Sequence, residues 1–595
     1  VVQRKDGGIY KLGKDSRYFK EISQLIHFTD EEAYIVNQLI EGLDNTNMLK
    51  QNLRKKLTAV YNCTSLAESV VEGKNAVNVN RIIEAIDNRH QVILKNYASS
   101  HTGVIRDRLV EPFGFTTNYV QIWCYDVEDG KTKLNDLIEN CTNRAAITYG
   151  GSCKINQAHY VGGCLAYVHE VGKKFYAAKT NNIYNYGAVK VEGGEFYDLK
   201  IGGVSAFLGG TTTHAYNYES GTIYFNATTR RHLHFAGVAQ AIKDTATDLA
   251  NYGDITIDGK IGHTLYGAGC ITLNNNYTRT RNSNHGDITV NAEIATNNFI
   301  GGLVYDSGAN LTYIDCHNTG NFILGEKAKV NTQTRWGGLV GKLEKNAKAG
   351  EEVYNIFNGC SNSGDIIIKG IASDTQYTSL GGIYGSATGN SRIIILNGFT
   401  NSGDIIFEGK NNGAYKDDDT MQNRSFVDMG GLFGVVASTI VFSNEANPSW
   451  TGNVVNTGTI KFAGTCKNGV TIGGLIGSAK SPHSTYPFPT GMRFVYTGDI
   501  SASGTFVKAT TATDTAASVE LINGIGGIYG YSNIANLVVE NAEVYTNITA
   551  SGYPNVGMLF GFARTANAYA KNCKVGGSTA SEYDTEDDEY ITTYL

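Results

Sequence analysis

Two short phrases alternate along most of this chain and limit strongly what it can fold into. The first is Asn-x-Gly-Asp followed by β-branched residues, as in Asn362-Ser-Gly-Asp-Ile-Ile-Ile, and the second is an apolar residue followed by Gly-Gly, as in Leu380-Gly-Gly-Ile-Tyr. Together they recur at a period of roughly 35 to 45 residues, which is typical of stacked repeat arrays. Short β-branched stretches bounded by glycine favour strands. The sequence therefore predicts a mostly β fold, with a parallel β-helix over 137–575 in which right-handed winding is favoured.

The spacing of the two phrases predicts the size of a coil. The step from one phrase to the next is roughly 16 to 19 residues, close to one coil of a β-solenoid. Each phrase is therefore expected to open one coil, so that a full repeat makes two coils. The glycine of Asn-x-Gly-Asp is expected to supply the positive φ that a corner requires.

Two sets of repeated residues are expected to have structural roles. The asparagines from Asn143 to Asn456 are expected to stack as a hydrogen-bonded ladder, which is not a binding site. The apolar residues before the Gly-Gly pairs are expected to point into the core. They are Val161, Ile201, Ile300, Trp336, Leu380, Met429, Ile472 and Ile525.

The composition excludes several classes of protein. The chain has 595 residues, and its 70 Gly and 6 Pro exclude collagen and proline-rich disorder, while 41% hydrophobic residues suffice for a core. A net charge of −6 gives no argument for nucleic acid or an anionic membrane as the partner of the whole chain. No apolar run reaches the ~18 residues of a membrane span. The chain starts at Val1 without a signal peptide, as expected of a processed or truncated product.

The ten cysteines do not form a recognisable disulfide scaffold, and no CxxC pair indicates a zinc site. Cys141, Cys316 and Cys360 each stand two residues before a repeat asparagine, where other copies carry apolar residues. We expect buried free thiols at these positions. With two coils per repeat, equivalent cysteines would lie about 10 Å apart, beyond disulfide reach.

The first part of the chain, 1–134, carries no repeat and is expected to form a small α+β domain. A capping box at Thr29 and Glu32 marks the start of its first helix, and apolar residues at helical spacing continue it. Alternating apolar stretches and a turn at Asp129-Gly130 indicate strands later in the segment. The predicted helices are 29–40, 49–60 and 82–86, and the predicted strands are 92–97, 106–115 and 120–127.

Three stretches of this segment, at Val92 to Tyr97, Arg108 to Pro112 and Gln121 to Asp126, resemble a WYL domain of bacterial transcriptional regulators. The resemblance implies a small, here incomplete, Sm-like β-barrel that senses a nucleotide-like or nucleic-acid ligand. It also implies that Arg108 and Tyr97 contact that ligand. The alternative interpretation of Arg108 is a solvated strand arginine. Because the array follows with no linker, a chimaera of two sources is a further interpretation.

The array resembles the GLUG-type and related glycine-rich repeats of bacterial surface adhesins, notably from Bacteroidetes. The resemblance implies a secreted or surface-bound parallel β-helix used for adhesion or as a stalk. Repeats that exceed the usual period predict loops, expected to protrude from one face, at 410–428, 479–493 and 505–518. Tyr415, Tyr486 and Phe488 are the binding residues expected on these loops. An acidic flexible tail is expected at 576–595.

No residue pattern identifies a catalytic residue, a metal site or a cofactor. The run Asp417 to Asp419 is interpreted as solvated loop charge, and the calcium-binding nonapeptide repeat is absent. His232 and His234, beside two arginines, are expected to form a cationic surface patch. Regularly repeated aspartates at one corner predict turn caps rather than the paired catalytic carboxylates of a glycosidase. They are Asp254, Asp287, Asp365, Asp404 and Asp499.

These observations predict a non-enzymatic, extracellular or cell-surface solenoid that binds glycans or surface proteins through protruding loops. No cofactor, metal or membrane span is expected. One alternative is a ligand-sensing regulator fragment, cytoplasmic by itself, that binds a nucleotide or nucleic acid through the N-terminal segment. A second alternative is a polysaccharide lyase or glycosidase, because β-helices host such enzymes.

Overall fold

The chain divides into two compact units, Val1–Asp136 and Leu137–Leu595. The computed structural model describes residues 2–3, 9–10, 81–132 and 137–582, apart from short segments. Those segments are 83, 87, 89, 99–104, 116–121, 127–130, 153–155, 169–178, 243, 274–277, 309, 345–352, 390, 414–426, 442–451, 481–492, 507–522, 535, 554, 564–566 and 578.

The first unit contains a four-stranded antiparallel sheet in the order β3-β4-β5-β6. The predicted strands are confirmed within one to two residues at each end. The third predicted helix is also present, because the described residues of 81–86 are helical, whereas the first two predicted helices and the turn lie outside the described residues. The strands are β1 (Val2–Gln3), β2 (Ile9–Tyr10), β3 (Val92–Ala98), β4 (Ile105–Phe115), β5 (Ile122–Asp126) and β6 (Lys131–Thr132).

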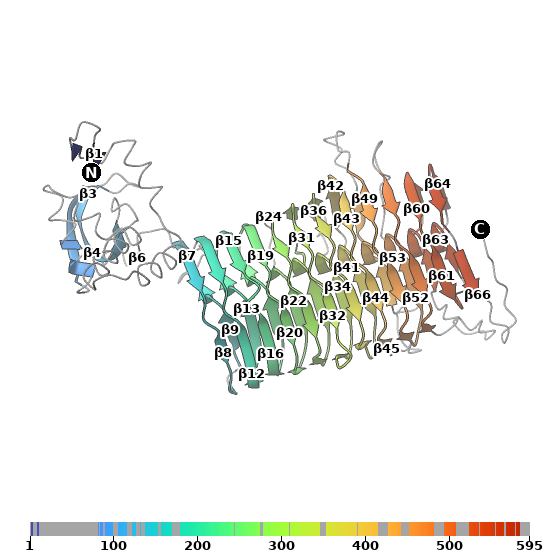
Figure 1. Ribbon diagram of the computed structural model, residues 1–595, viewed down its shortest axis with the longest axis horizontal. Coiled ribbons are helices and arrows are strands. Elements are labelled where there is room, and N and C mark those ends of the chain that lie inside the picture. The colour runs from blue at the N-terminus through green and yellow to red at the C-terminus, as the bar shows by residue number, and fades with distance from the viewer. Residues whose placement is uncertain are drawn as a thin grey trace. The chain divides into compact units, whose positions relative to one another are not determined.

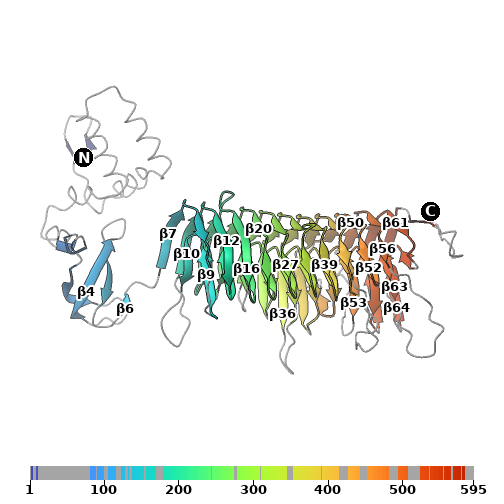
Figure 2. The same ribbon diagram turned by 90° about the horizontal axis from the view of Figure 1, so that it is seen from below.

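The second unit is a parallel β-helix, as predicted, and its strands stack side by side along one direction (Figure 1). One coil passes through four parallel sheets, which are visible from a second side in Figure 2. We name them, in chain order, the asparagine sheet, the isoleucine sheet, the approach sheet and the return sheet. One complete coil runs through β31 (His317–Asn318), β32 (Phe322–Leu324), β33 (Lys329–Val330), β34 (Thr334–Gly337), β35 (Val340–Leu343) and β36 (Tyr354–Asn358).

The asparagine sheet contains the strands that lead into Asn-x-Gly, and the isoleucine sheet contains the strands that follow it. The asparagine sheet runs from β7 (Leu137–Asn143) to β65 (Lys574–Gly576) and includes β11 (Lys179–Asn185), β15 (Thr212–Asn217), β19 (Ala246–Asn251), β48 (Thr439–Val441) and β49 (Val454–Asn456). The isoleucine sheet runs from β8 (Ile147–Tyr149) to β66 (Thr579–Glu582) and includes β16 (Ile223–Thr229), β45 (Lys410–Asn411), β56 (Thr505–Phe506) and β61 (Ile548–Ser551).

The approach sheet contains the strands before Gly-Gly, and the return sheet contains the strands after it. The approach strands are β9 (Ala158–Gly162), β13 (Asp198–Gly202), β17 (Leu233–Ala236), β22 (Leu265–Ala268), β28 (Asn298–Gly301), β34, β40 (Thr378–Gly381), β46 (Val427–Gly430), β52 (Val470–Gly473), β57 (Gly524–Gly526) and β62 (Val556–Gly557). The return strands are β10 (Leu165–Val168), β14 (Ser205–Leu208), β18 (Ala239–Ile242), β23 (Ile271–Leu273), β29 (Val304–Asp306), β35, β41 (Tyr384–Ala387), β47 (Phe433–Val436), β53 (Ile476–Lys480), β58 (Tyr529–Asn533) and β63 (Phe560–Ala563).

The strand register corrects the predicted coil size. Asn284 pairs with Asn318, and Gly301 pairs with Gly337, so equivalent residues of successive full repeats are direct neighbours. A full repeat is therefore one coil, not two, and each phrase opens half a coil. The prediction was wrong because both phrases recur with the same offset, and sequence spacing does not reveal which copies pair.

The asparagine ladder is confirmed. Each ladder side chain except the last donates from Nδ2 to Oδ1 of the asparagine in the next coil at 2.8 Å, and Asn456 donates instead to Gly474 O at 2.9 Å. The fully enclosed members are inaccessible to solvent, so these bonds also satisfy amides that water does not reach. The members are Asn143, Asn185, Asn217, Asn251, Asn284, Asn318, Asn362, Asn401 and Asn456.

The corner aspartates cap backbone groups, as predicted, but they cap the next coil rather than their own turn. Asp254 Oδ1 accepts from the Asp287 backbone N–H at 2.9 Å, and Asp404 Oδ1 accepts from Thr459 N–H at 2.7 Å. Asn321 takes the same role between Asp287 and Asp365. These aspartates form a second ladder along the coils, and that role accounts for their regular spacing.

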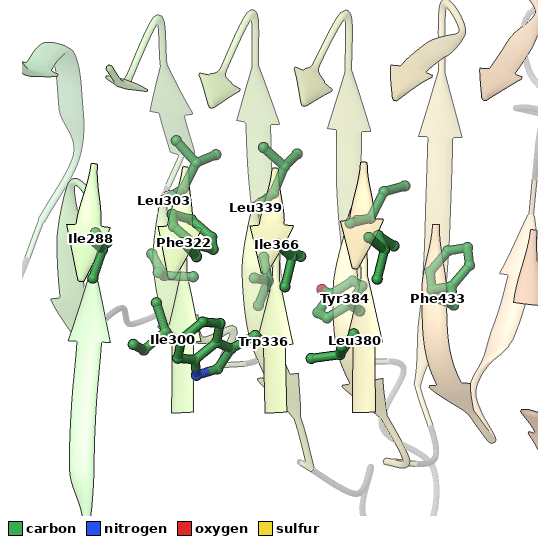
Figure 3. Packing of buried hydrophobic residues seen from close by; sticks show 14 of the residues in the cluster. Ile288, Ile300, Leu303, Phe322, Trp336, Leu339, Ile366, Leu380, Tyr384 and Phe433 are labelled. Carbon is green, nitrogen blue, oxygen red and sulfur yellow. The ribbon is translucent and has the colours of Figure 1, made fainter. Parts of the chain in front are cut away.

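The core is a column of apolar side chains enclosed by the four sheets. All eight residues predicted to point inward from before the Gly-Gly pairs are buried. Figure 3 shows Ile300, Trp336 and Leu380 in successive coils, with Phe322 from the isoleucine sheet close by. The Phe322 and Trp336 rings meet edge-on, with centroids 6.3 Å apart. The column therefore runs through successive coils, as a one-dimensional repeat array requires.

The glycine of Asn-x-Gly has a different role from the predicted one, because it does not adopt positive φ. A Cβ at Gly286 would lie 2.2 Å from the Gly253 carbonyl oxygen of the preceding coil. Close approach of neighbouring backbones therefore excludes a side chain there. Eight of the residues with positive φ stand three positions before the ladder asparagines. They are Asn140, Asn182, His214, Asp248, Arg281, Asp315, Gly359 and Gly398.

The cysteines are free thiols among the described residues, and Cys316 and Cys360 are buried as predicted, while Cys141 is half-buried. The predicted separation was wrong. Ile314 pairs with Asn358 and His317 pairs with Ser361, so Cys316 and Cys360 face each other in adjacent coils.

The array extends further than predicted. Strand β66 pairs with β61 through Ile548 and Thr579, so part of the expected acidic tail completes a coil. The rest of that tail, 583–595, lies outside the described residues. No helix in the part of the chain that the structure describes has the length and apolar character to cross a membrane.

Candidate binding face

The approach and return sheets meet at the Gly-Gly turn so that their outer faces look toward each other. Side chains from the two faces touch across the turn, since the Tyr160 and Tyr167 ring centroids lie 4.6 Å apart. The Lys342 ammonium likewise lies 4.7 Å from the Phe299 ring centroid. We call these two outer faces the bend face. Only two residues separate an approach strand from its return strand in every described coil, so the shape of the turn is conserved along the array.

In the first nine approach strands, one residue points onto the bend face two positions before the first residue of the Gly-Gly pair, a residue that is alanine in two coils, at Ala236 and Ala268. The strand register stacks these residues in one row. The first six coils supply large aromatic or basic side chains, and later coils supply small or acidic ones. The row is Tyr160, Lys200, His234, Tyr266, Phe299, Arg335, Ser379, Asp428 and Thr471.

Aromatic contacts make the first part of this row continuous. The His234 and Tyr266 rings stack with centroids 4.7 Å apart, and Tyr266 also lies 4.7 Å from the Tyr305 ring of β29. The Tyr167 ring stacks on Phe207 at 4.8 Å, and Tyr167 remains 47% exposed. Because many ring faces already contact one another, the groups available to a partner are chiefly ring edges and hydroxyls.

An ionic cluster follows the aromatic residues on β29, β34 and β35. The Arg335 guanidinium donates to the Glu344 carboxylate and to the Tyr377 hydroxyl. The Lys342 ammonium donates to Glu344 Oε2 at 2.6 Å and lies 3.7 Å from Asp306 Oδ2. The two cations are therefore balanced by two carboxylates within the cluster.

The two carboxyl groups of this cluster differ in acidity. Burial raises the pKa of Asp306 to about 6, although the Lys342 ammonium opposes the shift. Burial also acts to raise the pKa of Glu344, but the charges of Arg335 and Lys342 outweigh it and lower that pKa. Asp306 therefore titrates near pH 6, whereas Glu344 is already ionised there.

The predicted cationic patch around His232 is only partly cationic. Burial lowers the pKa of His232 to about 4 and that of His234 to about 3, so both imidazoles are neutral at pH 7. The Arg230 guanidinium lies 3.4 Å from Glu195 and stacks over the Tyr197 ring. The histidines therefore contribute rings and hydrogen-bonding groups, not charge.

In the later coils, the bend face carries small residues that are buried. Ser379, Ser386 and Ser478 are buried, although all three lie on the outer faces of the sheets. Their hydroxyls have no hydrogen-bond partner among the described residues. Asp428 is also buried there and accepts from the Thr471 hydroxyl at 2.7 Å. In these coils the approach row therefore offers a partner no large side chain, and large outer side chains return only at Tyr531 and Phe562 of the last two return strands.

The long connections between strands fall at the two corners beside the bend face. One corner joins the isoleucine sheet to the approach sheet, as between β45 and β46 or between β56 and β57. The other joins the return sheet to the asparagine sheet, as between β10 and β11 or between β35 and β36. The exception is the connection from β48 to β49. In repeat arrays, insertions at equivalent positions often mark the binding face.

The other predicted site residues fall in two groups. Tyr415, Tyr486 and Phe488 lie outside the described residues. Arg108 lies on β4 opposite Leu94 of β3 and is buried, so it is not the solvated strand arginine of the alternative interpretation. Tyr97 lies on β3 and pairs with Arg106.

The bend-face row was missed from the sequence, although its residues stand at a constant offset before Gly-Gly. The described residues contain no group of three or more histidine, cysteine or acidic residues placed to hold a metal ion. Comparison with protein-family models, with curated proteins and with solved structures finds no match for this chain.

Proposed function

We propose that this protein is a non-enzymatic, surface-displayed solenoid that binds glycans on its bend face. The observation that carries the proposal is the placement of the long connections, which with one exception fall at the two corners beside this face. The remaining corners keep nearly constant lengths and hold the structural ladders. Variation confined to one face of a repeat scaffold is typical of recognition.

The chemistry of the bend face fits a sugar chain. Half-buried tyrosines such as Tyr160 and Tyr266 offer apolar ring edges and hydroxyl groups together. Successive coils of parallel strands are about 4.8 Å apart. This spacing is close to the advance of one pyranose unit in an extended glycan, so one side chain per coil can meet one sugar unit.

Alanine substitution of two bend-face tyrosines, the exposed Tyr167 and the half-buried Tyr266, tests the proposal. We expect Tyr167→Ala and Tyr266→Ala each to weaken glycan affinity about tenfold, equivalent to about 1.4 kcal/mol, because each removes ring contacts and a hydroxyl group. The measurement is a glycan array with the full chain, followed by calorimetric titration of the strongest oligosaccharide.

The matched control is Tyr252→Ala, which removes a 37% exposed tyrosine from the corner between the asparagine and isoleucine sheets, which we call the asparagine corner. It should leave the affinity unchanged. Equal loss in Tyr252→Ala and the bend-face variants would contradict the proposed location. If the full chain bound cell-surface proteins but no glycan, the partner would be a protein and the glycan proposal would be rejected.

The carboxyl pair of the ionic cluster favours one second candidate, a glycan-cleaving enzyme. Glycosidases use one carboxyl group as acid and another as nucleophile or base, with their pKa values held apart. Asp306 would be the acid, because burial raises its pKa to about 6, and Glu344, whose pKa is lowered, would stay ionised.

This second candidate predicts a defined pH dependence. The acid must be protonated to act, so release of reducing ends should fall as the pH rises through about 6. Asp306→Asn should abolish product formation while leaving glycan binding in place. Binding without reducing ends or unsaturated products at any pH between 4 and 8 or so would reject the enzyme and retain the non-enzymatic proposal.

A further inference from the structure

A second column of aromatic residues lies on the asparagine corner, away from the bend-face row in the coil. These residues directly follow the ladder asparagines and stack one on the next. The Tyr186 and Tyr218 ring planes are 6° apart with centroids at 4.3 Å, while Tyr218 and Tyr252 are 6.1 Å apart. His285 continues the column, stacked on Tyr252 at 4.7 Å.

The ladder fixes the register of this stack. Asn185 donates to Asn217 at 2.8 Å immediately before the two tyrosines. The Tyr186 backbone N–H donates to Asn143 O at 2.8 Å, and Tyr218 N–H donates to Asn185 O at 2.9 Å. These hydrogen bonds fix the backbone at both tyrosines, so the two phenol rings are already in face-to-face contact in the folded array.

Both phenols are chemically accessible and interact directly. Tyr186 and Tyr218 are half-buried, so a small oxidant or a radical from solvent can reach their edges. Burial, and then the hydrogen bond with the Tyr186 phenol, raise the pKa of Tyr218. The Tyr218 phenol is therefore neutral at physiological pH, and its oxidation releases a proton together with the electron.

We propose that Tyr186 and Tyr218 are a site of oxidative cross-linking, in which a dityrosine bond joins two adjacent coils. Each phenol loses one electron and one proton, and the unpaired electron is shared with the ring carbons ortho to the hydroxyl. The two radicals couple through one Cε–Cε bond. The hydrogen on each of these two ring carbons then moves as a proton to the phenol oxygen of its own ring, which restores both aromatic rings and both hydroxyl groups. In total two C–H bonds break, and two electrons and two protons reduce one hydrogen peroxide to two waters.

Geometry selects this pair by distance and by ring orientation together. Tyr160 and Tyr167 are 4.6 Å apart but meet at 66°, and Tyr266 and Tyr305 are 4.7 Å apart but tilted by 44°, so neither pair is stacked face to face. At 4.3 Å the Tyr186 and Tyr218 rings are in van der Waals contact, whereas Tyr218 and Tyr252 at 6.1 Å must move before a bond can form. Tyr184 and Tyr216 are 5.6 Å apart and tilted by 38°. The cross-link would fix two positions that are far apart in the chain but already neighbours in the fold.

The test uses the full chain with a haem peroxidase and hydrogen peroxide. We expect dityrosine fluorescence whose rate per molecule is independent of protein concentration, and a single cross-linked peptide pair containing residues 186 and 218 by mass spectrometry. Tyr186→Phe should lose this peptide pair and most of the fluorescence, because phenylalanine keeps the ring stack but forms no phenoxyl radical.

Tyr252→Phe is the control and should keep the cross-link. Tyr218→Phe provides a second variant that should lose it, and the far-UV circular dichroism of each variant establishes that the array is folded. A cross-link mapped to other tyrosines would overturn the proposal. So would fluorescence that rises with protein concentration together with a covalent dimer on a denaturing gel.

Discussion

Replacing one ladder asparagine, Asn284→Ala, should lower the free energy of unfolding of the array by about 4 kcal/mol. Asn284 is inaccessible to solvent, donates to Asn318 Oδ1 at 2.8 Å and to Gly286 O at 3.0 Å, and accepts from Asn251 at 2.8 Å. The substitution leaves two buried acceptors and one amide hydrogen without partners. Each buried unsatisfied group costs about 1–3 kcal/mol.

Urea unfolding followed by far-UV circular dichroism measures the overall loss, and hydrogen–deuterium exchange locates it. Because repeat arrays unfold coil by coil when one interface is weakened, protection should fall most in the coils on either side of Asn284. Asn226→Ala is the matched control, since Asn226 lies exposed on β16 of the same array, and it should change stability by less than about 0.5 kcal/mol. Equal effects of the two substitutions would mean that the ladder adds nothing beyond ordinary surface polarity.

The ladders explain why much of the fold could be predicted from the sequence. An asparagine or aspartate that must bond its own equivalent in the next coil cannot be replaced freely, so it recurs in the sequence with its neighbours. The inward apolar residues before Gly-Gly recur for the same reason, because each fills one layer of the column. Asn284, Asp287 and Ile300 are therefore visible in the sequence as parts of a pattern.

Coil size and the left-handed positions could not be predicted in the same way. A repeat that forms one coil with two phrases has the same sequence period as a repeat that forms two coils with one phrase each. Only the pairing of Asn284 with Asn318 distinguishes the two arrangements. The left-handed conformation occurs at His214 and Arg281 as well as at Asn and Asp, so residue type alone does not mark it. There the position in the coil overrides the preference of the residue.

The candidate binding face was hidden for a different reason. Its row residues differ from coil to coil, from Tyr160 through Lys200 to Phe299, so repetition does not reveal them. Only their constant place, two residues before the first residue of the Gly-Gly or Ala-Gly pair, marks them as one surface. The sequence predicted protruding loops where repeats exceed the usual period. The structure adds that the insertions flank the face on which this row lies.

Alanine at the second glycine of the bend should be far more damaging than alanine at the first, although both are crowded. A Cβ at Gly302 would lie 2.1 Å from the Gly338 carbonyl oxygen of the next coil and 2.7 Å from the Asn318 amide carbon, so two coils would have to separate. We expect Gly302→Ala to lower the free energy of unfolding by about 3 kcal/mol, the upper range for overpacking. Gly301→Ala should cost about 1 kcal/mol.

The chain itself supplies the reason for this difference. The position of Gly301 is already alanine in two coils, at Ala236 and Ala268, so the turn accepts a methyl group there despite its contact with the following carbonyl. The position of Gly302 carries a side chain only at Met558, in the last described coil of the approach and return sheets, where no further coil pairs with it. Urea unfolding of the two variants should therefore give clearly different midpoints. Equal midpoints would show that crowding within the turn, rather than contact between coils, sets the requirement for glycine, and coil stacking would then not be what selects Gly-Gly.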